Sequence, residues 1–360
     1  MKKMALQLIQ RLAEGGELLD VRAPIEFQSG HFPGATNLPL LNNDERAAVG
    51  TAYKQQGADA ALQLGHQLVD GETRDRRLQG WINFLKDRPE AKICCFRGGL
   101  RSQLVQAELG RHGVDREIVK GGYKALRKTA VELLARVGQP LVVLGGLTGS
   151  GKTDLLKLRP HVDLEAAAEH RGSAFGARGV TPPHQAVFEN RLAVDFARVM
   201  EATTPIWIED ESRTIGRLVV PSFLFERMQS APLAVIEVPR SERARRLTQQ
   251  YLSEMFSAQE GVPPTEIEVE KVRQTLHTKL LQLQKRLGGL ETQKLALQLD
   301  ESVRDFSVTG RFASFWTWVE RLLEIYYDPM YLKHLDQNRD RIVFRGSPAD
   351  WISWSSPSRV

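Results

Sequence analysis

The sequence predicts an α/β protein in which two parallel-sheet domains are followed by a helical C-terminal extension. In two places a short apolar stretch is followed by a glycine-rich loop and then by a helical pattern. The first apolar stretch ends at Cys95 and the second at Gly146. This order of strand, loop and helix is typical of parallel α/β sheets. A length of 360 residues also exceeds what one hydrophobic core usually organises.

The first domain is expected to span residues 1–130. Strands are predicted at 17–22 and 91–96, and a helix at 100–111 follows the second strand. A polar stretch rich in alanine and glutamine, residues 42–80, is longer than an ordinary connection, and we expect it to be a helical insertion.

The second domain is expected at 138–240. Its first strand, 141–144, is continuously apolar, as in strands buried on both faces of a parallel sheet. Further strands are predicted at 205–208 and 233–238, where apolar runs end at polar residues.

The helical extension is expected at 241–360. Thr265 and Glu268 form a capping-box pattern, and apolar residues then recur at spacings of three and four until Gly288. This pattern predicts one long helix that ends at a glycine.

Composition indicates a globular protein, with 42% hydrophobic and 26% charged residues. The net charge of +5 permits a polyanionic partner without requiring one. Polar residues from Gln7 onward interrupt the apolar N-terminus before a signal sequence forms, and no apolar run approaches the roughly 18 to 20 residues that span a bilayer. The two cysteines, Cys94 and Cys95, are adjacent on an expected strand, which disfavours a disulfide between them. We therefore expect a cytoplasmic protein with no membrane partner.

A reactive cysteine loop is predicted at Cys95–Ser102, which reads CFRGGLRS. Gly98 and Gly99 allow backbone N–H groups to converge, while Arg97, Arg101 and the start of the helix add positive potential. Such surroundings lower the pKa of a thiol and can hold an anion, a persulfide or a perselenide. Cys95 is the predicted nucleophile; Cys94, on the opposite strand face, is the alternative.

Neighbouring strings give this loop its context. Asp20–Arg22, Glu26–Phe27, Gly30–Asn37 and Gly121–Tyr123 resemble the signature blocks of the rhodanese family, in the family's order. Five residues separate Cys95 from Arg101, where rhodanese sulfurtransferases usually have four. The wider loop resembles that of rhodanese-fold phosphatases and favours a tetrahedral oxyanion such as phosphate or a chalcogen-substituted phosphate.

A phosphate-binding loop is predicted at Gly146–Thr153, GLTGSGKT, which matches the Walker A pattern between a strand and a helix. Its backbone N–H groups, supported by Gly146, Gly149 and Gly151, would wrap the phosphates. Lys152 would neutralise their charge, and the Thr153 hydroxyl could ligate Mg²⁺.

Asp210 follows the strand 205–208, where a Walker B acid would lie, although a solvated strand end explains it equally well. Arginines after the strand 233–238 could close over phosphates or contact RNA, but a solvated basic helix face is the simpler explanation.

The whole chain resembles the tRNA 2-selenouridine synthase family, in which a rhodanese-like domain precedes a P-loop NTPase-like α/β domain. Beyond the two loops, the matching strings are Gly121–Arg127, His170–Gly176, Glu209–Arg213 and Tyr326–Tyr331.

This resemblance implies a transferase acting on the wobble 2-thiouridine of tRNAs for Lys, Glu and Gln. The sulfur is first alkylated by geranyl diphosphate, and selenophosphate then supplies the selenium that replaces it. In this scheme Cys95 carries or guides selenium, the P-loop holds the prenyl diphosphate and the cysteine loop holds selenophosphate. No tightly bound cofactor and no certain metal site is implied. Arg171, Ser173 and Arg213 could complete either anion site.

Two other classes of function remain open. One is an NTP-dependent sulfurtransferase or kinase with a rhodanese module, which would turn over NTP. The other is a non-catalytic tRNA-binding protein, which would tolerate loss of Cys95 and bind with a steep salt dependence.

Overall fold

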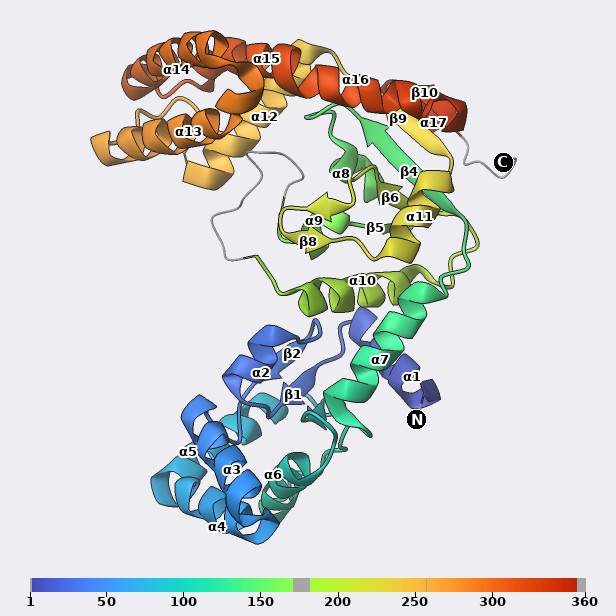
Figure 1. Ribbon diagram of the computed structural model, residues 1–360, viewed down its shortest axis with the longest axis vertical. Helices are drawn as coiled ribbons and strands as arrows, with labels where there is room; N and C mark the ends of the chain where they lie inside the picture. Colours follow the sequence, from blue (N-terminus) through green and yellow to red (C-terminus); the bar gives the residue numbers. More distant parts are fainter. Residues whose placement is uncertain (1, 171–181, 257, 355–360) are drawn as a thin grey trace. The chain divides into compact units, whose positions relative to one another are not determined.

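The computed structural model describes residues 2–170, 182–256 and 258–354, and the chain forms two compact units (Figure 1). The first unit comprises Met1–Gly138 and Pro183–Glu201, and the second comprises Gln139–Pro182 and Ala202–Val360. Both units contain parallel sheets flanked by helices, so the predicted α/β class is confirmed.

The first unit is built on a three-stranded parallel sheet in the order β2-β1-β3. Its core gathers Leu19 and Ile93 of the strands with Trp81 and Val105 of the flanking helices. Its elements are α1 Lys2–Ala13, β1 Leu18–Asp20, α2 Pro24–Ser29, β2 Ala35–Asn37, α3 Asn43–Gln56, α4 Ala58–Leu68, α5 Gly71–Leu85, β3 Lys92–Cys94, α6 Leu100–Arg111, α7 Gly122–Ala135 and α10 Gln185–Val199.

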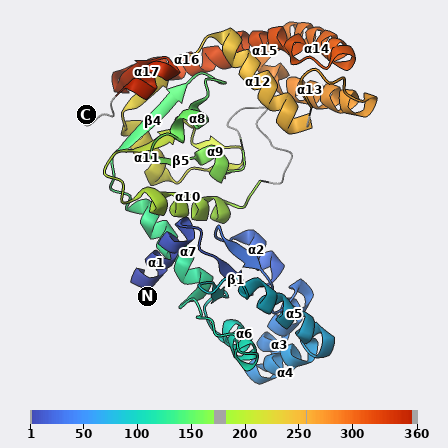
Figure 2. The same ribbon diagram turned by 180° about the vertical axis from the view of Figure 1, so that it is seen from behind.

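The insertion expected at 42–80 is helical and comprises α3, α4 and α5. Asn42 caps α3 through a capping box with Glu45, and Gly57, with φ of 92°, ends α3 and precedes α4. Both views of the molecule show these three helices gathered beside α6 (Figures 1 and 2).

Helix α10 belongs to the first unit although it lies within the segment 138–240. It packs on α1 and α7 through an apolar face that includes Phe188, Leu192 and Phe196. The buried Asn190 donates a 2.9 Å hydrogen bond to the His31 carbonyl. The helical periodicity of this segment does not reveal its packing partner, which only the tertiary structure shows.

The second unit contains a five-stranded parallel sheet in the order β10-β9-β4-β6-β5. The strands β4, β6 and β9 correspond to the three strands predicted from apolar runs. Strand β10 was not predicted, because its residues alternate between half-buried and exposed as expected for a sheet edge. The elements are β4 Leu141–Gly146, α8 Lys152–Leu156, β5 His161–Val162, α9 Leu164–Ala167, β6 Ile206–Glu209, β7 Thr214–Ile215, β8 Leu218–Val219, α11 Ser222–Ser230, β9 Leu233–Ile236, α12 Arg240–Phe256, α13 Glu266–Leu287, α14 Gly289–Thr309, α15 Trp316–Leu322, α16 Asp328–Gln337, β10 Ile342–Gly346 and α17 Pro348–Ser353.

The helical region after α12 has a separate core made of leucines of α13 and α14 and of Phe306, Phe312 and Phe315. Helix α13 begins after the capping box of Thr265 and Glu268, as its sequence predicts. A single turn of π-helix, Leu323–Tyr327, leads from α15 into α16. Among the described residues, no helix combines the length and apolarity needed to cross a membrane.

Candidate functional sites: a cysteine loop and a P-loop

Cys95 lies directly after β3, where the chain turns into the loop that leads to α6. Its side chain is buried, and the Ser102 hydroxyl donates a 2.7 Å hydrogen bond to its sulfur. Backbone N–H groups of Arg97, Gly99 and Ser102 also bond to this sulfur. The loop therefore converges on Cys95 in the way that its glycines suggested.

These hydrogen bonds set the charge of the sulfur. Burial raises the pKa of Cys95, but the bonds from the Ser102 side chain and from the three backbone N–H groups outweigh it, and the net pKa is lowered. A lowered pKa increases the population of the nucleophilic thiolate.

Cys94 has the opposite character. It is fully buried, and burial together with the nearby Asp20 carboxylate raises its pKa well above the ordinary value. A buried neutral thiol is a packing residue rather than a nucleophile. The geometry thus favours Cys95 over the alternative.

The segment Gly121–Tyr123 packs closely against the cysteine loop. A Cβ added at Gly122, whose φ is 58°, would lie 2.2 Å from the Cys95 carbonyl oxygen and 2.5 Å from the Gly98 nitrogen. Only glycine allows this approach. The Tyr123 amide donates to the Cys95 carbonyl at 2.9 Å, and the Tyr123 ring lies under the buried Arg22 guanidinium, 4.0 Å from its centre.

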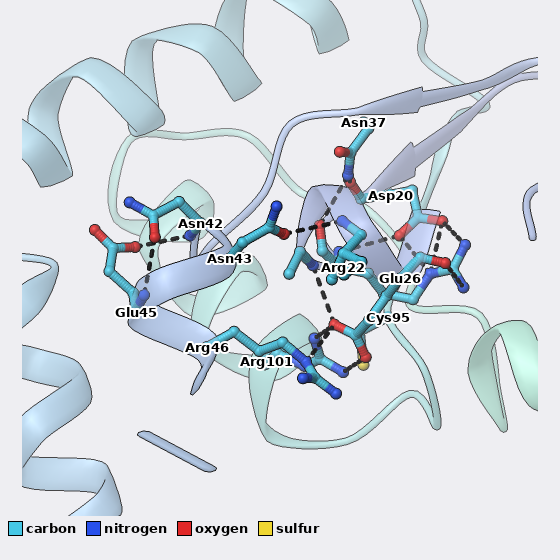
Figure 3. Close-up of polar contacts among 12 residues, drawn as sticks. Asp20, Arg22, Glu26, Asn37, Asn42, Asn43, Glu45, Arg46, Cys95 and Arg101 are labelled. Carbon is cyan, nitrogen blue, oxygen red and sulfur yellow. Dashed lines mark hydrogen bonds and ion pairs between the residues drawn. The ribbon is translucent and has the colours of Figure 1, made fainter. Parts of the chain in front are cut away.

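The two arginines of the loop differ in their partners. Arg101 forms an ion pair with Glu26, at 2.5 Å, and Arg46 reaches the same carboxylate at 3.5 Å (Figure 3). Burial raises the pKa of Glu26, but the hydrogen bonds and charge of Arg101 outweigh it and lower the net pKa. Arg97 is exposed, with its guanidinium 5.8 Å from the centre of the Phe96 ring. Arg101 therefore offers only part of its charge to an anion, while Arg97 faces solvent.

The P-loop connects β4 to α8 and takes the shape that its glycines allow. Gly146, Gly149 and Gly151 all have positive φ, at 153°, 85° and 80°. The Lys152 ammonium donates a 2.8 Å hydrogen bond to the Gly146 carbonyl. The Ser150 hydroxyl is buried and has no hydrogen-bond partner within the described part of the chain. A phosphate oxygen in the loop would give such a group a partner.

The acidic residues after β6 have distinct roles. The Thr153 hydroxyl donates a 2.8 Å hydrogen bond to Glu209, the last residue of β6. Asp210, the predicted Walker B acid, instead accepts hydrogen bonds from Tyr331 at 2.7 Å and from His334 at 3.0 Å. In the structure Glu209, rather than Asp210, is in contact with the threonine of the P-loop.

Burial raises the pKa of both Glu209 and Glu211. The nearby Glu165 carboxylate adds to the effect, so that the pKa of Glu209 is well above its ordinary value and that of Glu211 is about 8. The opposite holds for Asp210, because hydrogen bonds from His334 and Tyr331 outweigh its burial and lower its pKa. Asp210 is thus the charged carboxylate of this strand end.

Helix α16 supplies P-loop contacts that sequence reasoning missed. The Tyr331 hydroxyl accepts a 2.7 Å hydrogen bond from the Gly146 amide while it donates to Asp210. Asp328 forms a buried ion pair with Arg243 of α12, which also donates to the Thr148 carbonyl. The available signal was the string Tyr326–Tyr331, which sequence analysis used only for the family resemblance.

The remaining predicted residues are not brought to either loop. Arg171 and Ser173 lie outside the described residues. Arg213 is exposed at the hairpin of β7 and β8. No group of three or more His, Cys, Asp or Glu side chains able to hold a metal occurs in residues 2–170, 182–256 and 258–354.

Comparisons with known proteins agree with this architecture. Residues 139–359 match the family model described as the tRNA 2-selenouridine synthase AAA domain, and residues 4–129 match that of the rhodanese-like domain. Among solved structures, the chain is similar to the N-terminal domain of a protein from Clostridium difficile 630. The identity is 35%, over 31% of this chain and 85% of that chain, with a TM-score of 0.29.

Proposed function

This chain belongs to the tRNA 2-selenouridine synthase family, and we propose from that premise that it replaces the sulfur of wobble 2-thiouridine with selenium in two steps. The expected acceptors are tRNAs for Lys, Glu and Gln. The proposal rests chiefly on one observation: the chain presents two loops suited to anions, one whose N–H groups converge on the Cys95 sulfur and one rich in glycine that carries Lys152.

In the first step the P-loop holds geranyl diphosphate. The 2-thio sulfur attacks the first carbon of the geranyl group, the carbon–oxygen bond breaks, and the N3 proton of the base is lost. Lys152 and the loop N–H groups stabilise the charge of the departing diphosphate. Alkylation converts the sulfur into a better leaving group.

The Thr153 hydroxyl donates a hydrogen bond to the Glu209 carboxylate beside the P-loop. Oxygen ligands suited to Mg²⁺ therefore lie together there. Thr153 would hold the ion, with Glu209 behind it. Bound there, Mg²⁺ would neutralise part of the diphosphate charge.

In the second step the cysteine loop holds selenophosphate, and Cys95 guides selenium to C2 of the base. A C2–Se bond forms as the C2–S bond breaks, and geranyl thiol leaves. Water then cleaves the P–Se bond and releases phosphate, while N3 regains its proton. This exchange requires no oxidant or reductant.

Nucleoside mass spectrometry of tRNA from a deletion strain carrying each variant tests the scheme. Cys95→Ala should abolish 2-selenouridine and retain geranylated 2-thiouridine, whereas Lys152→Ala should lose both. Cys94→Ala and Lys157→Ala, which alter the neighbouring buried thiol and an exposed lysine, serve as controls. Equal 2-selenouridine in all strains would contradict the proposal.

A second candidate is an NTP-dependent sulfurtransferase or kinase with a rhodanese module. The contact between Thr153 and Glu209 favours it, because P-loop NTPases hold the Mg²⁺-binding threonine in a similar way. This function predicts NTP turnover, which Lys152→Ala should abolish. Selenation through geranylation predicts no NTP turnover.

A further inference from the structure

A large cavity lies in the first unit between the helical insertion and α6. Its volume is about 970 Å³, near the upper end of the roughly 300–1,000 Å³ of typical ligand pockets. The walls come mainly from α3, α4, α5 and the length of α6. Most of its lining residues lie outside the two loops described above.

The walls of the cavity are rich in apolar side chains. Tyr53, Leu62 and Leu100 all line it and remain 61%, 37% and 55% exposed. In the hairpin of α3 and α4 only Ala52 and Ala61 are buried. The hairpin therefore contributes little to the core, and its apolar side chains are free to contact a ligand.

The polar end of the cavity is shared with the cysteine loop. Glu26, Arg46 and Arg101 line it, and both arginines contact the Glu26 carboxylate (Figure 3). Arg101 precedes Ser102, whose hydroxyl bonds to the Cys95 sulfur. A ligand in the cavity would thus meet apolar side chains and also a charged cluster that includes Arg101 of the cysteine loop.

We propose that this cavity holds the geranyl chain of the S-alkylated wobble uridine while selenium replaces the sulfur. The identity of the chain rests on the proposed function. An unmodified RNA carries no long apolar group, so phosphate and base contacts alone would not require apolar walls beside Cys95. The alkylated uridine has the matching form, an apolar chain of ten carbons attached to the sulfur that must leave.

Chain burial gives the step a substrate preference. Transfer of the chain from water to the apolar walls stabilises the bound substrate in proportion to the area buried. An S-methyl group offers only one carbon for burial, against the ten carbons of the geranyl chain. We therefore expect S-geranyl-2-thiouridine RNA to be converted with a kcat/KM at least tenfold higher than S-methyl-2-thiouridine RNA.

Two glycines offer a matched pair of variants. Gly50 of α3 lines the cavity and Gly80 of α5 does not, and an added Cβ would meet nothing within 4 Å at either position. Gly50→Phe places a phenyl group in the cavity, whereas Gly80→Phe places the same side chain elsewhere on the insertion. Both are compared with the full-length wild type by their thermal unfolding midpoints.

The test supplies selenophosphate and an anticodon stem-loop RNA bearing either S-geranyl or S-methyl 2-thiouridine. Gly50→Phe should lose at least tenfold in kcat/KM on the S-geranyl RNA only, and Gly80→Phe should behave as the wild type. Geranylation of 2-thiouridine RNA by geranyl diphosphate should be unchanged in both variants.

Two results would overturn the cavity assignment alone: a wild type that converts both RNAs equally, or a folded Gly50→Phe variant that keeps the preference. The comparison of the S-geranyl and S-methyl RNAs uses the wild type alone and needs no variant. A wild type that converts neither RNA would overturn the proposed function, and the cavity assignment with it.

Discussion

Arg243 and Asp328 form a buried pair in which both guanidinium NH2 groups bond to the carboxylate, at 2.9 and 2.8 Å. The same guanidinium donates a 3.0 Å hydrogen bond to the Thr148 carbonyl. Because Thr148 lies in the P-loop, a residue of α16 fixes the loop through an arginine of α12.

Removal of one partner leaves the other charge buried without compensation. Asp328→Ala is expected to lower the free energy of unfolding by about 3–5 kcal/mol, measured by urea denaturation. Glu270→Gln, which breaks the exposed pair of Glu270 and Arg273, is the control and should leave the midpoint unchanged. A similar midpoint for both variants would show that the buried pair does not stabilise the unit.

Ser102 should control the ionisation of Cys95. Its hydroxyl is one of the groups that lower the Cys95 pKa, so Ser102→Ala should raise that pKa by about one to two units, given roughly 1.5–3 kcal/mol for a hydrogen bond to a charged group. The measurement is a titration of thiolate ultraviolet absorbance in a Cys94→Ser background. A titration midpoint identical to that of the parent would contradict this role.

Loss of the Tyr331 hydroxyl should weaken ligand binding at the P-loop and leave the cysteine loop unaffected. Tyr331→Phe leaves the Gly146 amide without its acceptor and removes a donor from Asp210. We expect roughly 5- to 150-fold weaker binding of geranyl diphosphate in calorimetry, since an unpaired buried group costs about 1–3 kcal/mol. Tyr326→Phe, whose hydroxyl accepts from Arg286, is the control and should bind normally.

The raised pKa of Glu211 predicts that the stability of the folded protein depends on pH. Its folded-state pKa of about 8 lies above the ordinary 4.5, because burial and Glu165 disfavour its charge. Between these pH values the folded protein holds a proton that the unfolded chain releases, so this contribution to stability is present below about pH 4.5 and is lost as the pH rises to about 8.

The Glu211→Gln variant should therefore gain in unfolding midpoint relative to the wild type as the pH rises across that window. Glu270→Gln should stay parallel to the wild type across this window, because the hydrogen bond from Arg273 lowers the Glu270 pKa and places its titration below the window. Parallel curves for the wild type and Glu211→Gln would argue against a raised pKa.

Local sequence patterns were sufficient to predict much of the fold. The helix predicted at 100–111 is α6, and the capping box at Thr265 begins α13, because both depend on contacts within a few residues of the chain. The family resemblance is confirmed over both domains.

The long-range contacts of the site were beyond sequence reasoning. Nothing in the local pattern around Tyr331 indicates that its hydroxyl reaches Gly146, 185 residues away. The choice between Glu209 and Asp210 likewise depends on which side of β6 each carboxylate faces, and consecutive residues differ in this respect. The roles of the individual site residues remain predictions that the experiments above test.

The membership of α10 in the first unit bears on how the chain acquires its structure during synthesis. Asn190 and the apolar face of α10 complete the packing of α1 and α7, so the first unit can finish folding only after Val199 has left the ribosome. By then β4 and the P-loop have already emerged, and the two units must mature in an interleaved order rather than one after the other. A nascent chain released at Gly138 would expose the surface of α1 and α7 that α10 covers.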